Sequence, residues 1–280
     1  MIFNKNLAAI HGYLCSDGYV IKNSDTQKHK YYHIGLRNTN ETLLKDFQLK
    51  FDRVFGLKPT ITNGRSSIHN KELYYFLTKD FSYYSYEWKL PDINKENLIY
   101  WLRTFFDCEG WVENQPAKSR LIGADCCNED GLWNIKKALN KLDIESQIKK
   151  RKGRTIWRLT ICNIANLKRF HKTIKFLHPD KNKKLIDAID SYKDYYWEIP
   201  DSKENLIKFI KEKGRFRESR NEIRFMSIKR QNLIKLKKAL NKYYISSKIF
   251  GPWKNNTGSL YYCLTIKQEG GNKLWQNVQK

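Results

Sequence analysis

The segment IHGYLCSDG at residues 10–18 and the segment LRTFFDCEG at residues 102–110 decide how this chain folds. Each is an apolar stretch with helical character that ends in an acid followed by glycine, Asp17-Gly18 in the first and Glu109-Gly110 in the second. We expect each glycine to end its helix in the left-handed backbone conformation that glycine tolerates best. The two copies therefore predict two equivalent helices, each with a carboxylate at its C-terminal end.

Matching blocks elsewhere indicate that the chain arose by internal duplication. KENLI at 95–99 recurs at 203–207, and KKALNK at 136–141 recurs in the same order at 237–242. A third apolar stretch at 206–210 runs into EKG at 212–214, where Lys213 takes the place of the acid. Such self-similarity predicts three repeats, which we place at 1–90, 91–200 and 201–280.

Each repeat shows the same order of elements, αββαββα. In the first repeat we expect strands at 19–21 and 31–37, a helix at 41–55 closed by Gly56, strands at 58–61 and 65–68, and a last helix from about residue 70. The matching helices of the later repeats lie at 131–142 and 230–243. Their strands lie at 146–151, 155–161, 245–250 and 259–266, and a hairpin turn at 255–258 joins the last pair. The sequence predicts an α+β fold of tandem units.

The composition favours a polyanionic partner. The net charge is +24, from 53 Lys and Arg against 29 Asp and Glu, which suits nucleic acid or an anionic membrane. No apolar run approaches the roughly 20 residues that span a bilayer, and the N-terminus has no leader pattern, so we expect an intracellular protein with no membrane partner. The six cysteines form no C-x-x-C pair, which argues against a zinc site and favours reduced, buried thiols.

The two helix-ending acids point to a metal site. A helix C-terminus is the negative end of the helix dipole, and two carboxylates side by side repel each other. A divalent cation between them would remove that conflict, and oxygen ligands favour Mg²⁺, for which Mn²⁺ can substitute. Acid-glycine pairs are also common in ordinary turns. Two copies at equivalent positions in a strongly basic chain favour the metal site over the turn.

Both nine-residue segments resemble the LAGLIDADG motif of homing endonucleases, monomeric enzymes that carry two such motifs. The resemblance implies that the motif helices pack together at a pseudo-twofold axis, with Gly12 opposite Thr104, between two sheets that form a β-saddle. It also implies that Asp17 and Glu109 lie over the minor groove of double-stranded DNA. Each acid would then help to cut one strand, leaving four-base 3′ overhangs.

The resemblance extends to residues beside the acids and has two departures. It implies that the backbone carbonyls of Ser16 and Cys108 make additional metal contacts. The sixth motif position, often Asp in the family, is Cys15 in the first copy. No accessory basic residue is clearly matched, and Arg37 is the candidate in the first repeat. The third repeat is a degenerate copy that lacks the acid.

Side chains alternate across a strand, so one face of each sheet packs on helices and the other is free to read DNA. Residues expected on the buried faces are Val20, Ile34, Leu36, Ile148, Trp157, Leu159 and Ile161. Candidate nucleic-acid contacts are Tyr19, Asn23, His33, Arg37, Arg65, Lys149, Arg151 and Arg158, with Lys213 and Arg224 from the third repeat. For any one of these residues, an ordinary solvated or structural role is an equal alternative.

These observations predict a site-specific DNA endonuclease that makes a metal-dependent double-strand break. The ends of the chain carry no intein-type splicing signals, so we expect an intron-encoded or free-standing enzyme. An RNA maturase that binds intron RNA with the same fold, or a non-cleaving DNA-binding protein, is the alternative. Retention of both acids favours the endonuclease. The basic third repeat either lengthens the DNA footprint or only stabilises the fold.

Overall fold

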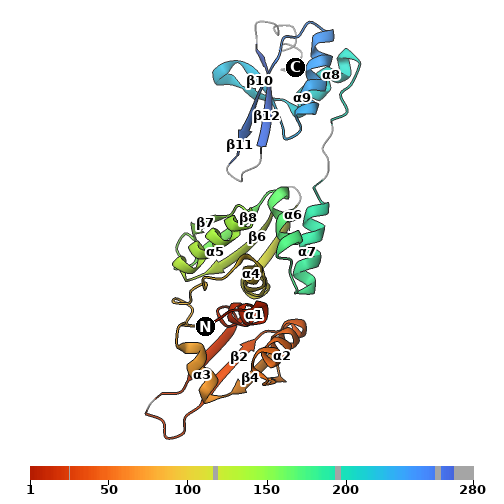
Figure 1. The fold of residues 1–280 in the computed structure, drawn as a ribbon. Helices are drawn as coiled ribbons and strands as arrows, with labels where there is room; N and C mark the ends of the chain where they lie inside the picture. Colours follow the sequence, from red (N-terminus) through yellow and green to blue (C-terminus); the bar gives the residue numbers. More distant parts are fainter. Residues whose placement is uncertain (25, 116–118, 193–196, 256–259, 268–280) are drawn as a thin grey trace. The chain divides into compact units, whose positions relative to one another are not determined.

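The structure is a computed structural model, and it describes residues 1–24, 26–115, 119–192, 197–255 and 260–267. The chain forms two compact units, Met1–Tyr192 and Lys193–Lys280, and each is described by itself. Figure 1 shows the first unit in red to green and the second in blue-green to blue. Among the described residues, no helix combines the length and apolar character needed to cross a membrane.

The first repeat forms a four-stranded antiparallel sheet with helices on one side. Its elements are α1 (Lys5–Leu14), β1 (Gly18–Lys22), β2 (Tyr32–Arg37), α2 (Glu41–Phe55), β3 (Thr60–Thr62), β4 (Arg65–His69) and α3 (Lys71–Thr78). The strand order is β1-β2-β4-β3. Helix α2 begins after the capping side chain of Asn40 and ends at Gly56, whose φ of 64° is left-handed as predicted.

The second repeat has the same plan with one additional helix. Its elements are α4 (Lys95–Glu109), β5 (Gly110–Gln115), β6 (Ser119–Cys126), α5 (Glu129–Lys141), β7 (Gln147–Lys150), β8 (Trp157–Cys162), α6 (Ile164–Thr173) and α7 (Pro179–Asp190). The strand order, β5-β6-β8-β7, matches that of the first repeat. Figure 1 shows α1 and α4 packed side by side between the two sheets, which is where the two repeats meet.

The second unit holds a third sheet of the same kind. Its elements are α8 (Lys203–Lys213), β9 (Arg215–Arg217), the 3₁₀ turn η1 (Glu218–Arg220), β10 (Glu222–Ser227), α9 (Arg230–Lys242), β11 (Lys248–Lys254) and β12 (Leu260–Lys267). The strand order is β11-β12-β10-β9. Most of the predicted turn at 255–258 and any final helix beyond Lys267 lie outside the described residues. The α+β class is confirmed, as is the αββαββα plan in the first two repeats, and the described part of the third repeat shows αββαββ.

Helix α1 is buried on all sides because it contributes to two cores. Ile10 and Leu14 pack with the first sheet, whereas Ala8 packs with the residues of the second repeat. The predicted inward residues Val20, Ile34, Leu36, Leu159 and Ile161 are buried. Ile148 and Trp157 are only partly buried, because they lie on the edge strand β7 and at the start of β8.

The motif glycines serve a different purpose from the one predicted. Gly110 and Gly214 have φ values of −77° and −78°, and Gly18 has no positive φ, so the left-handed helix end was wrong for all three. A Cβ atom on Gly18 would lie 2.4 Å from the Leu14 Cα atom, and one on Gly110 would lie 2.4 Å from the Phe106 carbonyl oxygen. Glycine is needed because the first strand of each repeat turns back tightly over the last helical turn.

Candidate functional site

Helices α1 and α4 pack against each other along a contact that we call the α1–α4 seam. The two motif acids lie at the neighbouring ends of these helices. Thr104 Oγ1 donates a hydrogen bond of 3.0 Å to the carbonyl oxygen of Ala9. Gly12 lies directly against it: a Cβ there would be 2.3 Å from Thr104 Oγ1 and 2.6 Å from the Trp101 carbonyl oxygen. Close backbone approach of this kind requires a residue without a side chain.

Asp17 and Glu109 lie where these helices end, and the charge of Asp17 acts on Glu109. Burial, and next the charge of Asp17, raise the pKa of Glu109 from 4.5 to about 7. Asp17 is held by its neighbours in the first repeat: Asn38 Nδ2 donates to Asp17 Oδ2 at 2.7 Å, and the Arg37 N–H donates to its carbonyl oxygen at 3.1 Å. Two half-buried acids therefore lie close enough to interact at these helix ends.

Lys181 is a residue of this site that the sequence did not reveal. Its Nζ donates to the carbonyl oxygens of Asp107, at 2.5 Å, and Cys108, at 3.0 Å, at the C-terminal end of α4. Burial lowers the pKa of Lys181, while the acids nearby oppose that shift. Its charge also lowers the pKa of Glu109, so the ammonium lies beside the acid pair. The Cys108 carbonyl, predicted as a metal contact, already accepts this hydrogen bond.

Asp107, at the sixth motif position, fixes the helix that carries Lys181. Its buried carboxylate accepts hydrogen bonds from the backbone N–H groups of Leu177, at 2.9 Å, and His178, at 3.0 Å, just before α7 begins. In the first motif Cys15 takes this position, and its Sγ lies 3.4 Å from His11 Nδ1. The first copy therefore lacks an equivalent anchor.

Arg37 and Arg65 lie beside Asp17 in a shallow cavity of about 470 Å³, which Asn38 also lines. The two arginines are opposite each other in the β2–β4 register and therefore point to the same face of the sheet. A site with two guanidinium groups next to a carboxylate has the charge to receive a phosphate close to that acid.

The other candidates of the first sheet have partners of their own. Tyr19 packs over Gly35, where a Cβ would lie 2.7 Å from the Tyr19 hydroxyl. Asn23 accepts a 2.9 Å hydrogen bond from the Tyr31 N–H and also donates to the loop that follows it. The ring of His33 lies 4.1 Å from that of His69 on the same face. Their role in DNA binding stays a prediction.

In the second sheet, Asp125 engages two of the predicted DNA contacts. Arg158 donates two hydrogen bonds to its carboxylate, at 2.7 and 2.8 Å, and Arg151 donates one at 3.1 Å. These contacts, led by Arg158, lower the pKa of Asp125. Arg158 also lies 4.8 Å above the ring of Trp111, and Lys149 is its register neighbour on β7. DNA would have to compete with Asp125 for these arginines.

The two candidates from the third repeat belong to the second unit. Lys213 ends α8 and is exposed. Arg224, on β10, donates a 2.8 Å hydrogen bond to Cys263 Sγ and lies 5.8 Å from the Trp253 ring centroid. Lys213 stands at the motif position that Asp17 and Glu109 occupy in the first two repeats.

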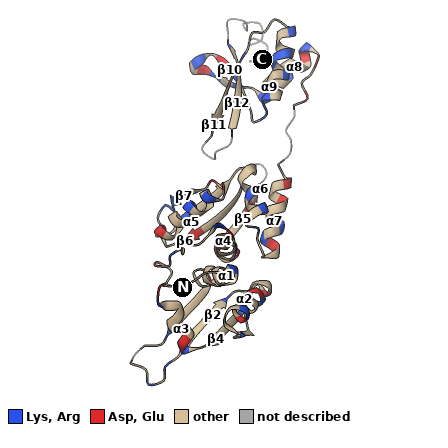
Figure 2. Cartoon of the chain, in the orientation of Figure 1, with Lys and Arg blue, Asp and Glu red and all other residues tan. Residues whose placement is uncertain are grey.

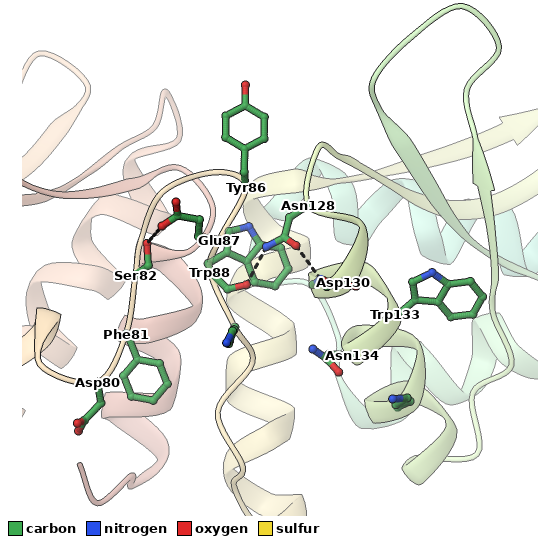
Figure 3. Close-up of a pocket in the computed structure, with 13 residues that line it drawn as sticks. Asp80, Phe81, Ser82, Tyr86, Glu87, Trp88, Asn128, Asp130, Trp133 and Asn134 are labelled. Atoms are coloured by element: carbon green, nitrogen blue, oxygen red, sulfur yellow. Dashed lines mark hydrogen bonds between the residues drawn. The ribbon is translucent and has the colours of Figure 1, made fainter.

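A larger cavity, of about 1040 Å³, lies where the linker between the repeats passes α5. Figure 3 shows two hydrogen bonds in its wall: Asn128 Nδ2 donates to the Trp88 carbonyl oxygen at 2.7 Å, and Ser82 donates to Glu87 at 2.8 Å. These contacts hold the linker on the second repeat. We therefore interpret this cavity as a consequence of how the linker packs on α5, and we do not treat it as a binding site.

The acid pair fits a hard divalent cation in charge and donor type, though it is an incomplete ligand set. Among the described residues, no group of three or more His, Cys, Asp or Glu side chains could hold a metal. Two carboxylates at helix ends provide oxygen donors, and burial, followed by the charge of Asp17, raises the pKa of Glu109. Backbone carbonyls, water or DNA phosphate would have to complete the coordination.

Residues 4–86 and 96–175 each match the sequence model of a LAGLIDADG-like domain, and together they cover more than half of the chain. The chain belongs to the LAGLIDADG family. The two matched regions coincide with the two repeats that carry the acids, so the predicted LAGLIDADG resemblance is confirmed. No curated protein sequence matches the chain.

Several solved structures are similar to the LAGLIDADG repeats in this chain. The homing endonuclease I-DmoI in complex with DNA and calcium is 19% identical, with a TM-score of 0.49, over 65% of this chain and 99% of that one. I-WcaI bound to its DNA recognition sequence is 16% identical, with a TM-score of 0.44, over 66% and 88%. The N-terminal LAGLIDADG domain of WhiA is 14% identical, with a TM-score of 0.42, over 61% and 82%.

The raised pKa of Glu109 gives a prediction for the metal-free protein. Because the pKa of Glu109 is higher in the folded state, the protonated form of this acid stabilises the folded protein. That contribution to the free energy of unfolding is complete below pH 4.5 and is lost as the pH rises to about 7. At pH 8 in EDTA, Glu109→Gln should therefore raise the free energy of unfolding by roughly 2 kcal/mol. Urea unfolding at pH 8 and pH 4 measures this. Equal stability of the two proteins at pH 8 would contradict the prediction.

Proposed function

We propose that this chain is a site-specific DNA endonuclease of the homing type, which makes a double-strand break in the presence of a divalent metal ion. The observation that carries the proposal is the pair Asp17 and Glu109 at the paired ends of α1 and α4, where burial and mutual repulsion raise the pKa of Glu109. A fold that needed no cation there would gain stability by losing one of the acids.

In this proposal Asp17 and Glu109 hold Mg²⁺, or Mn²⁺ in its place, and the carbonyl oxygens of Ser16 and Cys108 are further candidates for contact. When bound, such a cation supplies activation of a water molecule and neutralises charge on the scissile phosphate. Arg37 and Arg65 would bind the phosphate beside Asp17. The pseudo-twofold pairing of the helices would direct one acid to each strand across the minor groove, with four-base 3′ overhangs.

The remaining predicted contacts complete the proposed DNA interface. The open faces of the two sheets carry Tyr19 and His33 in the first repeat and Lys149 and Arg158 in the second, while Asn23 and Arg151 directly follow β1 and β7. Pairing of the last two arginines with Asp125 supports selective contact, because only a partner that offers better acceptors replaces a carboxylate. We expect binding as a monomer, since one chain supplies both acids.

The test of this function is cleavage of a supercoiled plasmid that carries the uninterrupted form of the host gene. We expect a single linear product in Mg²⁺ or Mn²⁺ and none in EDTA, with mapped ends that are four bases apart. A plasmid with the intron inserted at the junction is the matched control and should stay intact. Tight binding without cleavage in either metal would instead identify a maturase or a non-cleaving DNA-binding protein.

Lys181→Met should slow cleavage about 10- to 100-fold and leave DNA affinity nearly unchanged. The ammonium lies beside Glu109, where it can stabilise charge that builds on the reacting phosphate. Because the charge of Lys181 also acts on Asp17, cleavage of both strands should slow in this variant. Single-turnover gel assays measure the cleavage of both strands.

The control for this variant is Lys184→Met, which removes an exposed lysine from the same helix. Lys181→Arg should recover part of the rate, because it keeps the positive charge near the carbonyl oxygens of α4. If Lys181→Met lowered DNA affinity and cleavage rate by the same factor, the lysine would serve only to bind DNA.

A further inference from the structure

The sheet of the second unit has one face that neither α8 nor α9, the helices described in that unit, covers. Ile223, Phe225, Leu264 and Ile266 point to the other face and are buried against α8 and α9. The register places Arg224, Met226, Lys248, Phe250, Trp253 and Tyr261 together on the uncovered side, which we name the open face. The open face therefore extends from β10 to β11 across the central strand β12, where Cys263 and Thr265 are buried.

Aromatic side chains form a row on the open face. A register shift between Phe250 and Trp253 puts both residues on the same side although they are three positions apart. Their rings are nearly parallel, 15° apart with centroids at 6.3 Å, and Tyr261 lies 5.8 Å from Trp253. Phe250 and Trp253 are 42% and 39% exposed, and Met226 beside them is 47% exposed. Flat apolar surfaces are thus presented to solvent instead of the core.

Cations surround this aromatic row. Arg215 and Arg217 on β9 and Lys267 on β12 share the open face with Arg224 and Lys248. Glu222 is the one acid that the register places among them, and Arg217 pairs with it at 3.6 Å. Residues 198–280 contain 19 Lys and Arg against 7 Asp and Glu. Figure 2 shows Lys and Arg in blue on this unit's helices and strands. The charge complements a polyphosphate backbone.

The motif helix of this unit has lost the surface that pairs two LAGLIDADG repeats. With Gly214 matched to Gly110, Lys208 takes the place of Thr104 and Asn205 that of Trp101. Thr104 and Trp101 are buried in the α1–α4 seam, whereas Lys208 and Asn205 are exposed. Helix α8 therefore lacks the apolar surface through which α1 and α4 pack together. Without that surface, we do not expect this sheet to pair with a second one into a saddle around duplex DNA.

We propose that the open face of β9–β12 binds single-stranded nucleic acid. Phe250 and Trp253 would stack on unpaired bases, and Arg224 and Lys248 would contact the phosphates between them. A duplex is a poor ligand for such a row, because its bases already stack on one another and present only their edges. The proposal does not depend on the acid pair of the first unit, so a failure of either leaves the other intact.

The test measures the affinity of the full chain in EDTA for fluorescently labelled single strands by anisotropy. The probes are twenty-nucleotide oligo-dT, oligo-U of the same length, and a duplex without a target site. Phe250→Ala combined with Trp253→Ala should weaken binding of at least one single strand by about tenfold or more and leave duplex binding nearly unchanged. Comparison of the two single strands identifies whether the ligand is DNA or RNA.

The matched control is Tyr84→Ala combined with Tyr86→Ala, which removes two exposed aromatic rings from the other unit. Trp253→Phe should keep most of the affinity because it keeps a stacking ring, and the exposed Lys248→Glu should lower it without disturbing the core. The proposal is overturned if the double alanine variant binds single strands like the control, or if single-strand and duplex binding fall by the same factor.

Discussion

Asp17→Asn and Glu109→Gln should each lower the rate of double-strand cleavage about 10³-fold or more. Both changes keep the size of the side chain and replace a charged carboxylate with a neutral amide. An amide offers one oxygen and no negative charge, so it cannot hold a divalent cation at the helix ends. The measurement is a single-turnover time course on supercoiled target plasmid, in which nicked and linear products are counted separately.

The matched control is Glu41→Gln, because Glu41 is an exposed carboxylate that pairs with Lys45 on the same helix. All three variants should bind target DNA with nearly wild-type affinity, since removing an acid does not remove a phosphate contact. The double variant should cut neither strand. Wild-type cleavage by either single variant would show that its acid does not hold the metal, and the proposed site would have to be abandoned.

Local signals explain why much of the fold could be predicted from the sequence. Helix α2 was predicted at 41–55 and observed as Glu41–Phe55, because Asn40 caps its start and Gly56 its end. The block KENLI begins both α4 and α8, and the block KKALNK ends both α5 and α9, so the repeated blocks fall in equivalent helices. Each of these features depends on residues that are close in sequence.

Strand ends were harder to predict where the backbone is irregular. The strand predicted at 245–250 is β11, Lys248–Lys254, so it begins and ends later than expected. A register shift between Phe250 and Trp253 interrupts the alternation of inward and outward side chains on which the prediction relied. The role of the motif glycines could not be predicted for a similar reason. Glycine is required there because the strand lies very close to the preceding helix, and that distance is known only from the structure.

The parts of the site that the sequence did not reveal are contacts between distant residues. Lys181 reaches the Cys108 carbonyl across 73 positions, and Asp107 holds the N–H of His178 across 71. Pro179 and the acids of α7 predict that a helix begins there, but they do not predict which residues that helix contacts. Asp125 likewise pairs with Arg158 across 33 positions, so two arginines predicted as free for DNA already have a partner.

Gly12→Ala should destabilise the first unit by about 2–4 kcal/mol. The added Cβ would lie 2.3 Å from Thr104 Oγ1 and 2.6 Å from the Trp101 carbonyl oxygen, well inside normal contact distance. The α1–α4 seam would have to open, because the carbonyl belongs to the backbone and cannot move aside. Urea unfolding measures the loss of stability, and the cleavage rate should fall with it as the two acids separate.

Two further variants separate crowding from the loss of glycine itself. Gly56→Ala changes a glycine with φ of 64° whose surroundings are empty within 4 Å, so it should cost only about 1 kcal/mol of backbone strain. Thr104→Ala in the Gly12→Ala background removes the hydroxyl but leaves the Trp101 carbonyl in place, and it should recover only part of the stability. A Gly12→Ala variant no less stable than Gly56→Ala would mean that the two helices tolerate a wider spacing, and the acids would then not depend on this seam for their approach.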